Sequence, residues 1–371
     1  MSTDSVHACP EPGGNAPDTT VGHDAFRDLG VLRSRLRDLG AKPGHERALL
    51  RAWLNAQPLA SAAGSRQGFF PRRLEAELPG LEIGLGGILR SIAEHPGADG
   101  SARLLCELAD GETIESVLLP GAGLCVSVQV GCAVGCVFCM TGRGGLRRQL
   151  GSAEILAQVA AARRRRRVAK VVFMGMGEPA HNLDAVLDSI DLLGREGGIG
   201  YKNLVLSTVG DRRVFDRLPE LPVKPALAIS LHTMFASKRA SLLPRAPHID
   251  PETLVELGER YARATHYPIQ YQWTLLAGVN DGDDELERIA QALAGKYAVM
   301  NFIPWNTVDG ADFARPSNER ALTMTRSLNA RGVLAKLRDS AGQDVDGACG
   351  QLRARGVGAK VVGRAAAAAV G

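Results

Sequence analysis

Apolar residues at helical spacing mark the first part of the chain. Leu, Val and Trp recur every three or four positions in FRDLGVLRSRLRDLG, HERALLRAWLNAQ and PRRLEAELPGL, between Ala25 and about Leu89. This spacing predicts short amphipathic helices, and we expect a small helical module over residues 25–100. Residues 1–24 are rich in Pro, Gly, Asp and Thr, and residues 353–371 end in GRAAAAAVG. The first segment is predicted to be a disordered tail and the second a loose C-terminal tail.

The pattern changes to short strands in residues 101–352. ARLLCELADG and ETIESVLLP predict a β-hairpin, because Asp110-Gly111 between strand-like runs favours a tight turn. Beyond it, helical patterns separate the apolar runs CVSVQV, VAKVVFMG, LVLSTV, ALAISL, IQYQWTLL, MNFIPW and VLAKLRD. Continuously apolar strands separated by helices indicate a parallel sheet covered on both faces. The predicted fold is α/β, with about six βα units in an open or closed TIM-like barrel and its active site at the carboxyl ends of the strands.

Composition and charge exclude several classes of protein. Hydrophobic residues make up 45% and charged residues 23% of the chain, which argues against a disordered or fibrous protein. No apolar run is long enough for a membrane span, and MSTDSVHACPEPGGNAPDTT lacks the apolar core of a signal peptide, so we expect a cytoplasmic protein without membrane association. The net charge of +4 permits a nucleic-acid partner without requiring one.

The cysteines provide the first candidate chemistry. Four of the seven lie between Cys125 and Cys139, a clustering that indicates a metal or redox site rather than a disulfide framework. Cys132, Cys136 and Cys139 form a CxxxCxxC run directly after the first predicted parallel strand. A structural zinc site has four ligands, and no second pair is present, so zinc is the weaker interpretation. Three thiolates can hold a [4Fe-4S] cluster and leave one iron open for S-adenosylmethionine, and this spacing resembles the radical-SAM superfamily.

A glycine-rich motif follows the second strand. In FMGMGEP, Gly175 and Gly177 let the backbone approach a ligand, and Glu178 can accept a hydrogen bond from an ammonium group. This resembles the GGE-type motif of radical-SAM enzymes. The same residues also satisfy the GxGxxA fingerprint of a Rossmann oxidoreductase, but three clustered thiolates have no use in a nicotinamide enzyme.

Polar residues at the ends of three further strands are candidate cofactor contacts. We expect them to fix the ribose, carboxylate and adenine groups of the cofactor, although turns, helix caps and, for the histidine, a satisfied core position are the alternatives. These candidates are Ser207, Ser230, Leu231, His232 and Asn306.

Taken together, the motifs resemble one family closely. LCVSVQVGCAVGCVFCMTG, FMGMGEP, AISLH, GVND, IPWN and DVDGACGQL occur in the order found in the RlmN/Cfr family of radical-SAM RNA methyltransferases, over roughly Leu104 to Leu352. The resemblance implies a partial (β/α)6 radical-SAM barrel with one [4Fe-4S] cluster on Cys132, Cys136 and Cys139. It also implies that S-adenosylmethionine is bound by the strand-end residues, with Gly177 and Glu178 among them.

The family's chemistry assigns roles to three more residues. By resemblance, Cys349 is methylated by one S-adenosylmethionine, and a deoxyadenosyl radical from a second removes a hydrogen from that methyl group. The methylene group then adds to an adenine ring carbon. Glu115 matches the proton acceptor, with a surface-strand carboxylate as the alternative. Cys125 matches the resolving thiol that forms a transient disulfide with Cys349.

The resemblance also implies partners. The substrate would be an adenosine of 23S rRNA and, in some relatives, of tRNA, with carbon 2 favoured over carbon 8. Another RNA, a protein or a small molecule is the alternative substrate, and RNA binding without catalysis is a further hypothesis. We expect an electron donor such as flavodoxin or ferredoxin, and a monomer suffices. Arg147, Arg148 and the helical module are the candidate RNA contacts, as is the Arg163–Arg167 run, for which a solvated helix end is the alternative.

Overall fold

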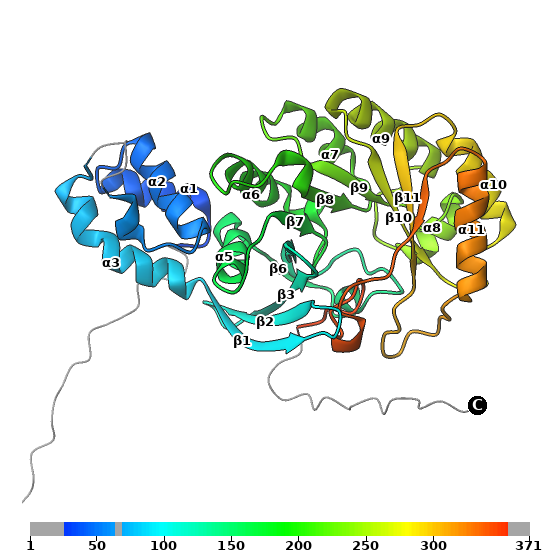
Figure 1. Ribbon diagram of the computed structural model, residues 1–371, viewed down its shortest axis with the longest axis horizontal. Coiled ribbons are helices and arrows are strands. Elements are labelled where there is room, and N and C mark those ends of the chain that lie inside the picture. The colour runs from blue at the N-terminus through cyan, green and yellow to red at the C-terminus, as the bar shows by residue number, and fades with distance from the viewer. Residues whose placement is uncertain (1–25, 64–68, 355–371) are drawn as a thin grey trace, which may run out of the picture.

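Three helices form the N-terminal unit of the computed structural model, which describes residues 26–63 and 69–354. They are α1 (Leu29–Asp38), α2 (Pro43–Leu54) and α3 (Arg72–Gly87), drawn in blue to cyan in Figure 1. Their apolar faces meet in a core that includes Leu32, Leu50 and Leu74, each at most 2% exposed. The N-terminal helices therefore form as the spacing predicts. The predicted tails lie outside the described residues, apart from residues 353 and 354.

An antiparallel ribbon joins this unit to the rest of the chain. It consists of β1 (Leu89–Pro96), β2 (Ala102–Leu108) and β3 (Thr113–Leu119). The predicted hairpin is confirmed as β2 and β3, with Gly111 at φ +82° in its turn. Strand β1 differs from the expectation of helices throughout residues 25–100. Its side chains show neither a helical nor a clearly alternating burial pattern, because backbone pairing with β2 determines its conformation.

Parallel strands make up the rest of the main sheet. The sheet order is β1-β2-β3-β4-β7-β8-β9-β10-β11-β12, and all pairs from β4 onward are parallel. These strands are β4 (Gly123–Cys125), β7 (Lys170–Phe173), β8 (Leu204–Thr208), β9 (Ala226–Ser230), β10 (Ile269–Leu275), β11 (Ala298–Pro304) and β12 (Ala335–Leu337). Since β1 and β12 are the two ends of the order, the sheet is an open, partial barrel, and the α/β prediction is confirmed.

Helices connect the parallel strands and cover the outside of the curved sheet (Figure 1). They are α5 (Ser152–Arg163), α6 (Leu183–Arg195), α7 (Arg212–Arg217), α8 (Ala236–Leu242), α9 (Pro251–Thr265), α10 (Asp283–Leu293) and α11 (Asn318–Ala330). Within the described ranges, every helix is too short or too polar to span a membrane.

The first predicted parallel strand is divided in two. CVSVQV contributes Cys125 to β4, and the chain then leaves the main sheet. It pairs as β5 (Gln129–Gly131) with β6 (Leu146–Gln149) in a separate two-stranded sheet. The residues between β5 and β6, which include α4 (Met140–Arg143), carry the three clustered cysteines. The division therefore moves the cysteine loop away from the main sheet and over one end of it.

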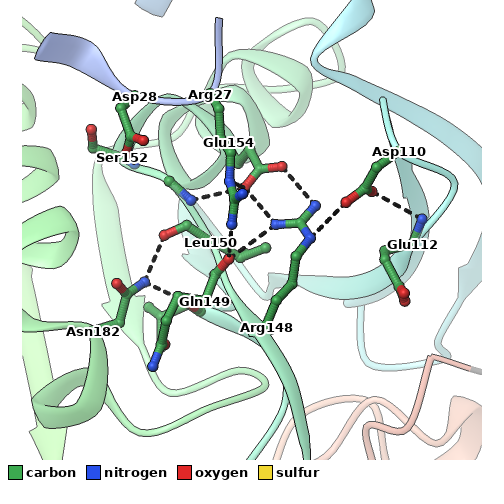
Figure 2. A network of polar contacts seen from close by, with 12 residues as sticks. Arg27, Asp28, Asp110, Glu112, Arg148, Gln149, Leu150, Ser152, Glu154 and Asn182 are labelled. Atoms are coloured by element: carbon green, nitrogen blue, oxygen red, sulfur yellow. Dashed lines mark hydrogen bonds and ion pairs between the residues drawn. The ribbon is translucent and has the colours of Figure 1, made fainter. Parts of the chain in front are cut away.

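A polar network joins the N-terminal unit, the hairpin turn and the start of α5 (Figure 2). Arg148 donates to both carboxylate oxygens of Glu154 at 2.9 Å and pairs with Asp110 at 2.6 Å. Asp28 accepts a hydrogen bond from the backbone N–H of Ser152 at 3.1 Å. Arg148 is therefore occupied within the protein. Arg147 is 67% exposed in its side chain and has Glu112 as its partner.

The arginine run also makes internal contacts. Arg163 donates to the carbonyls of Leu54 and Gly197, and Arg165 pairs with Glu94 at 2.9 Å. Arg166 donates to the carbonyl of Gly100 at 2.9 Å. These arginines connect the end of α5 to the N-terminal unit and the ribbon, a structural role that neither sequence interpretation included.

Candidate active site

A cavity of about 400 Å³ lies against the inner face of the parallel strands. It collects most of the residues predicted from the motifs: Cys125, Cys132, Cys136, Cys139, Gly177, Glu178, Ser207, Ser230, His232 and Cys349. Three other predicted site residues, Glu115, Leu231 and Asn306, lie close by but are not part of its lining. Residues separated by more than 200 positions thus share one cavity.

The cysteine loop forms one end of this cavity. The backbone N–H of Cys132 donates to Gly145 at 3.0 Å, and that of Cys139 donates to Cys136 at 3.1 Å. Burial raises the pKa of Cys132 to about 12. Burial and the charges of the other two thiols raise the pKa of Cys136 well above its usual value. The three thiols are therefore electrostatic neighbours, and Cys132 and Cys136 keep their protons until a cation binds.

The donor set fits an iron–sulfur cluster better than a single ion. No three His, Cys, Asp or Glu side chains in residues 26–63 and 69–354 are arranged to hold a metal ion on their own. Three thiols from one short loop are the ligand set of a [4Fe-4S] cluster with one open iron. A closed tetrahedral zinc site needs a fourth ligand, and none joins them here.

The glycine-rich loop brings backbone against the cavity beside the cysteines. Gly177 has φ +106°, and a Cβ there would lie 2.6 Å from the Gln129 side chain, so only glycine fits. Glu178 follows and is 5% exposed. Its two oxygens accept from the backbone N–H groups of Ala180 and Val209, each at 3.1 Å. Burial raises the pKa of this carboxyl to about 7, so a bound ammonium group would favour its ionised form.

His232 is a neutral hydrogen-bond donor to the cavity. Its Nδ1 accepts from the backbone N–H of Thr274 at 3.0 Å, which leaves the proton of the neutral ring on Nε2. Burial, assisted by Arg239, lowers its pKa to about 3. The ring packs edge-on against Phe138 of the cysteine loop, with 4.9 Å between centroids. Leu231 next to it is fully buried, and its backbone N–H donates to the carbonyl of Gln272 at 3.0 Å.

Cys349 approaches the cysteine loop from the C-terminal segment, residues 338–354. Asn306 Nδ2 donates to the Cys349 carbonyl at 3.0 Å, and the N–H of Met140 donates to Gly350 at 2.8 Å. The Oδ1 atom of Asn306 is buried without a hydrogen-bond partner. Cys349 is exposed, yet the surrounding protein desolvates its thiol and raises its pKa to about 11. Burial, together with the charge of Cys349, raises the pKa of Cys125 to about 12. Asn306 therefore holds the loop that places Cys349 in the cavity with Cys125.

Glu115 contacts the same segment from the opposite side. The carboxylate is buried on β3 and forms an ion pair with Arg103. Its Oε2 accepts from the backbone N–H groups of Arg353 at 2.8 Å and Ala354 at 3.1 Å. Arg103 also donates to the carbonyl of Val345 at 2.6 Å. This pair thus anchors both sides of the Cys349 loop, and the role of Glu115 as proton acceptor stays a prediction.

Sequence reasoning missed several residues that line or support the cavity. Arg239 is 3% exposed and donates to the carbonyls of Val209 and Ser230, at the ends of two strands. Gln270 and Gln272 line the cavity, as do Lys170 and Arg338. The two glutamines could have been predicted from the sequence, because they occupy alternate positions of IQYQWTL, in a strand otherwise expected to be apolar.

Sequence comparison relates the chain to known proteins. Residues 126–293 match the model of the radical SAM superfamily. A protein of Aromatoleum aromaticum named "Probable RNA methyltransferase" is 67% identical over 91% of this chain and 95% of its own length. One of Thiobacillus denitrificans with the same name is 65% identical over 90% of this chain and 92% of its own.

A solved structure shows the same fold. The crystal structure of a radical SAM methyltransferase from Sphaerobacter thermophilus is 35% identical, with a TM-score of 0.77, and covers 89% of this chain and 98% of its own. The identities and the nearly complete coverage lead to one conclusion. The chain belongs to the radical-SAM family that these probable RNA methyltransferases form.

Proposed function

We propose that this protein methylates a ring carbon of an adenosine in RNA, with carbon 2 favoured over carbon 8. The proposed substrate is 23S rRNA, with tRNA as a second substrate. The observation that carries the proposal is a single cavity lined by the three cysteines of one loop and by Cys125 and Cys349. A radical-SAM enzyme without a methyl-carrying thiol needs only the three cysteines of the loop. The presence of Cys125 and Cys349 supports methylation through a covalent protein intermediate.

The cofactors of the family fit the residues present. When bound to Cys132, Cys136 and Cys139, a [4Fe-4S] cluster supplies the electron that cleaves S-adenosylmethionine reductively. Glu178 offers carboxylate oxygen to the ammonium group of that molecule, and His232 offers an N–H donor. Ser207 and Ser230 line the same cavity and offer hydroxyl groups.

Cys349 carries the methyl group. Its thiol loses a proton and displaces the sulfonium leaving group of one S-adenosylmethionine, which forms a methyl thioether and S-adenosylhomocysteine. A pKa of about 11 keeps the thiol protonated at neutral pH, so this step depends on a nearby positive sulfonium that favours the thiolate. A deoxyadenosyl radical from a second S-adenosylmethionine would take one hydrogen atom from the methyl group, and the carbon would then bond to the adenine ring and link the RNA to Cys349.

Cys125 releases the product. Glu115 is the proposed acceptor of the ring proton, and movement of residues 338–354 would free its carboxylate from Arg353 and Ala354. The Cys125 thiolate attacks the sulfur of Cys349, the sulfur–carbon bond breaks, and a proton completes the methyl group on the base. The one electron left on the base would return to the oxidised cluster that Cys132, Cys136 and Cys139 would hold. The resulting disulfide takes up two electrons and two protons before the next turnover, and flavodoxin or ferredoxin is the proposed donor.

Methylation of Cys349 tests the carrier mechanism. The reconstituted protein, incubated anaerobically with S-adenosylmethionine bearing a deuterated methyl group, should gain one labelled methyl on the Cys349 peptide. A Cys349→Ala variant should keep its iron and lose RNA methylation. Cys106→Ala is the matched control, because Cys106 is buried on β2 outside the cavity. Continued RNA methylation by Cys349→Ala would contradict the proposal.

The RNA target needs a separate measurement. Mass spectrometry of nucleosides from 23S rRNA and tRNA, from cells with and without the gene, should show a difference in 2-methyladenosine. A difference in 8-methyladenosine would move the reaction to carbon 8. Equal levels of both nucleosides would redirect the search to another RNA, a protein or a small molecule.

A further inference from the structure

The cavity extends along the parallel strands beyond the cysteines. Ser230 and His232 line it at the carboxyl end of β9, next to the cysteine loop. Lys170 is the first residue of β7 and Gln270 the second of β10, and both line the same cavity near the amino ends of their strands. The cavity therefore has a second end that neither the motifs nor the proposed mechanism uses.

Two exposed cations line the cavity: Lys170 begins β7, and Arg338 directly follows the last residue of β12. Neither has an ion-pair partner among the described residues. Arg338 donates from Nε to Asn301 Oδ1 at 2.8 Å, which fixes the guanidinium and leaves its terminal N–H groups free for a ligand. Asp339 lines the cavity too, but its carboxylate lies 3.3 Å from Arg315. Two neighbouring cations without a counter-charge favour an anionic ligand.

Amide groups lie deeper in the cavity. Gln270 and Gln272 alternate along β10, and neither side chain has a hydrogen-bond partner within the described part of the chain. Asn301, opposite Gln272 in the strand register, is fully buried, and its Nδ2 has no partner. Side-chain amides pair with the donor and acceptor edge of a nucleobase, and with adenine in particular. Cations, amide groups and the reactive thiols therefore belong to one cavity and its immediate surroundings.

We propose that the target nucleotide of an RNA binds in the cavity beside these cations and amides. Lys170 and Arg338 bind the phosphates that flank it, and Gln270 and Gln272 contact the edge of the unpaired base. This inference rests on the proposed function, because the ligand is an RNA adenosine on its way to Cys349. A volume of about 400 Å³ accommodates a base extruded from its stack.

Salt-dependent binding tests the role of the cations. Each phosphate contact to a single strand contributes about 0.7 to the slope of log binding constant against log salt concentration. We expect Lys170→Gln and Arg338→Gln each to weaken binding of a fluorescent RNA stem-loop with one unpaired loop adenosine by roughly tenfold, and to reduce that slope by about 0.7. Lys336→Gln is the control, since Lys336 is an exposed lysine of β12 outside the cavity lining.

A second variant separates base contacts from phosphate contacts. Gln270→Leu should weaken binding of the same RNA without a change in the salt slope, because a neutral amide releases no counterion. The Lys336→Gln control should still accept a methyl group on Cys349, since that step needs no RNA. Wild-type affinity and salt slope in both Lys170→Gln and Arg338→Gln would overturn the inference. Failure of the wild-type chain to methylate Cys349 would instead contradict the proposed function.

Discussion

His232 shows how burial determines the state of a single side chain. Its pKa is lowered to about 3 by burial, whereas an unfolded chain leaves histidine near 6.5. Between these values the unfolded state binds more protons than the folded state. Stability therefore increases with pH across this window and is lost as the pH falls below 6.5. Above pH 6.5 both states are neutral at this residue, and it contributes no pH dependence.

A His232→Gln variant should remove this dependence. At pH 5 the histidine lowers the free energy of unfolding of the wild-type protein by about 2 kcal/mol relative to pH 7.5, whereas glutamine does not titrate. Urea unfolding of both proteins at the two pH values measures the difference, and effects common to both proteins cancel. An identical pH dependence in the two proteins would show that His232 is protonated in the folded state.

The sequence predicted which residues form the site, but it did not predict what each side chain contacts. Cys132, Glu178 and Cys349 belong to motifs, and the structure brings them to one cavity. Asn306 was predicted from its place at a strand end and Glu115 by resemblance, and the structure shows both holding the backbone of the Cys349 segment. Such contacts join positions more than 40 residues apart and leave no periodic signal in the chain.

At the scale of elements, one glycine fixes the position of the cysteine loop. Gly131 ends β5 at φ +80°, and a Cβ there would lie 2.0 Å from the carbonyl oxygen of Gly145. Gly131→Ala should therefore separate β5 from β6 and destabilise the loop by about 1–3 kcal/mol. We expect the purified variant to bind less iron, measured per chain after anaerobic reconstitution.

Gly144→Ala provides the matched control for this loop. Gly144 has φ −79°, and a Cβ there would meet no atom within 4 Å. It should bind as much iron as the wild-type protein. Equal iron in Gly131→Ala and Gly144→Ala would mean that the approach of β5 to Gly145 does not position the cysteines.

The same loop explains why one strand prediction was incomplete. CVSVQV is apolar or small apart from Gln129, and its pattern contains no sign that the chain leaves the main sheet after Cys125. The departure depends on distant partners: the N–H of Val128 donates to Met176 at 2.8 Å, and Cys132 pairs with Gly145. The alternation of later strands and helices carried more information, because each helix must return the chain to a parallel neighbour.

At the scale of the whole molecule, the C-terminal segment connects the two edges of the open sheet. It leaves β12 and passes beside the antiparallel ribbon, as the red segment near β1 and β2 in Figure 1 shows. Asp344 accepts from Ala98 at 2.8 Å, and Asp99 accepts from Gly342 at 3.0 Å. The position of Cys349 relative to Cys125 therefore depends on contacts with the ribbon, far from either cysteine in the chain.

Arg103 of the ribbon also contacts the C-terminal segment. Its replacement by lysine tests whether the ribbon positions Cys349. Arg103 joins the Val345 carbonyl and the Glu115 carboxylate through one planar group, whereas lysine keeps the charge and loses the fork. Loss of one charge-assisted hydrogen bond costs about 1.5–3 kcal/mol. If that bond holds Cys349 near Cys125, Arg103→Lys should shift the equilibrium of their disulfide against glutathione by about tenfold toward the dithiol.

Peptide mapping by mass spectrometry, after anaerobic equilibration in glutathione buffers, measures this equilibrium without any turnover. Arg90→Lys is the control, because Arg90 pairs with Glu107 on the exposed side of the same ribbon and touches no part of the C-terminal segment. In Arg90→Lys, the ratio of reduced to oxidised glutathione at which half of the protein carries the disulfide should equal that of the wild-type protein. The same ratio in Arg103→Lys would mean that the segment keeps its place through Asn306 and the cysteine loop alone, and that the ribbon does not position the methyl-carrying thiol.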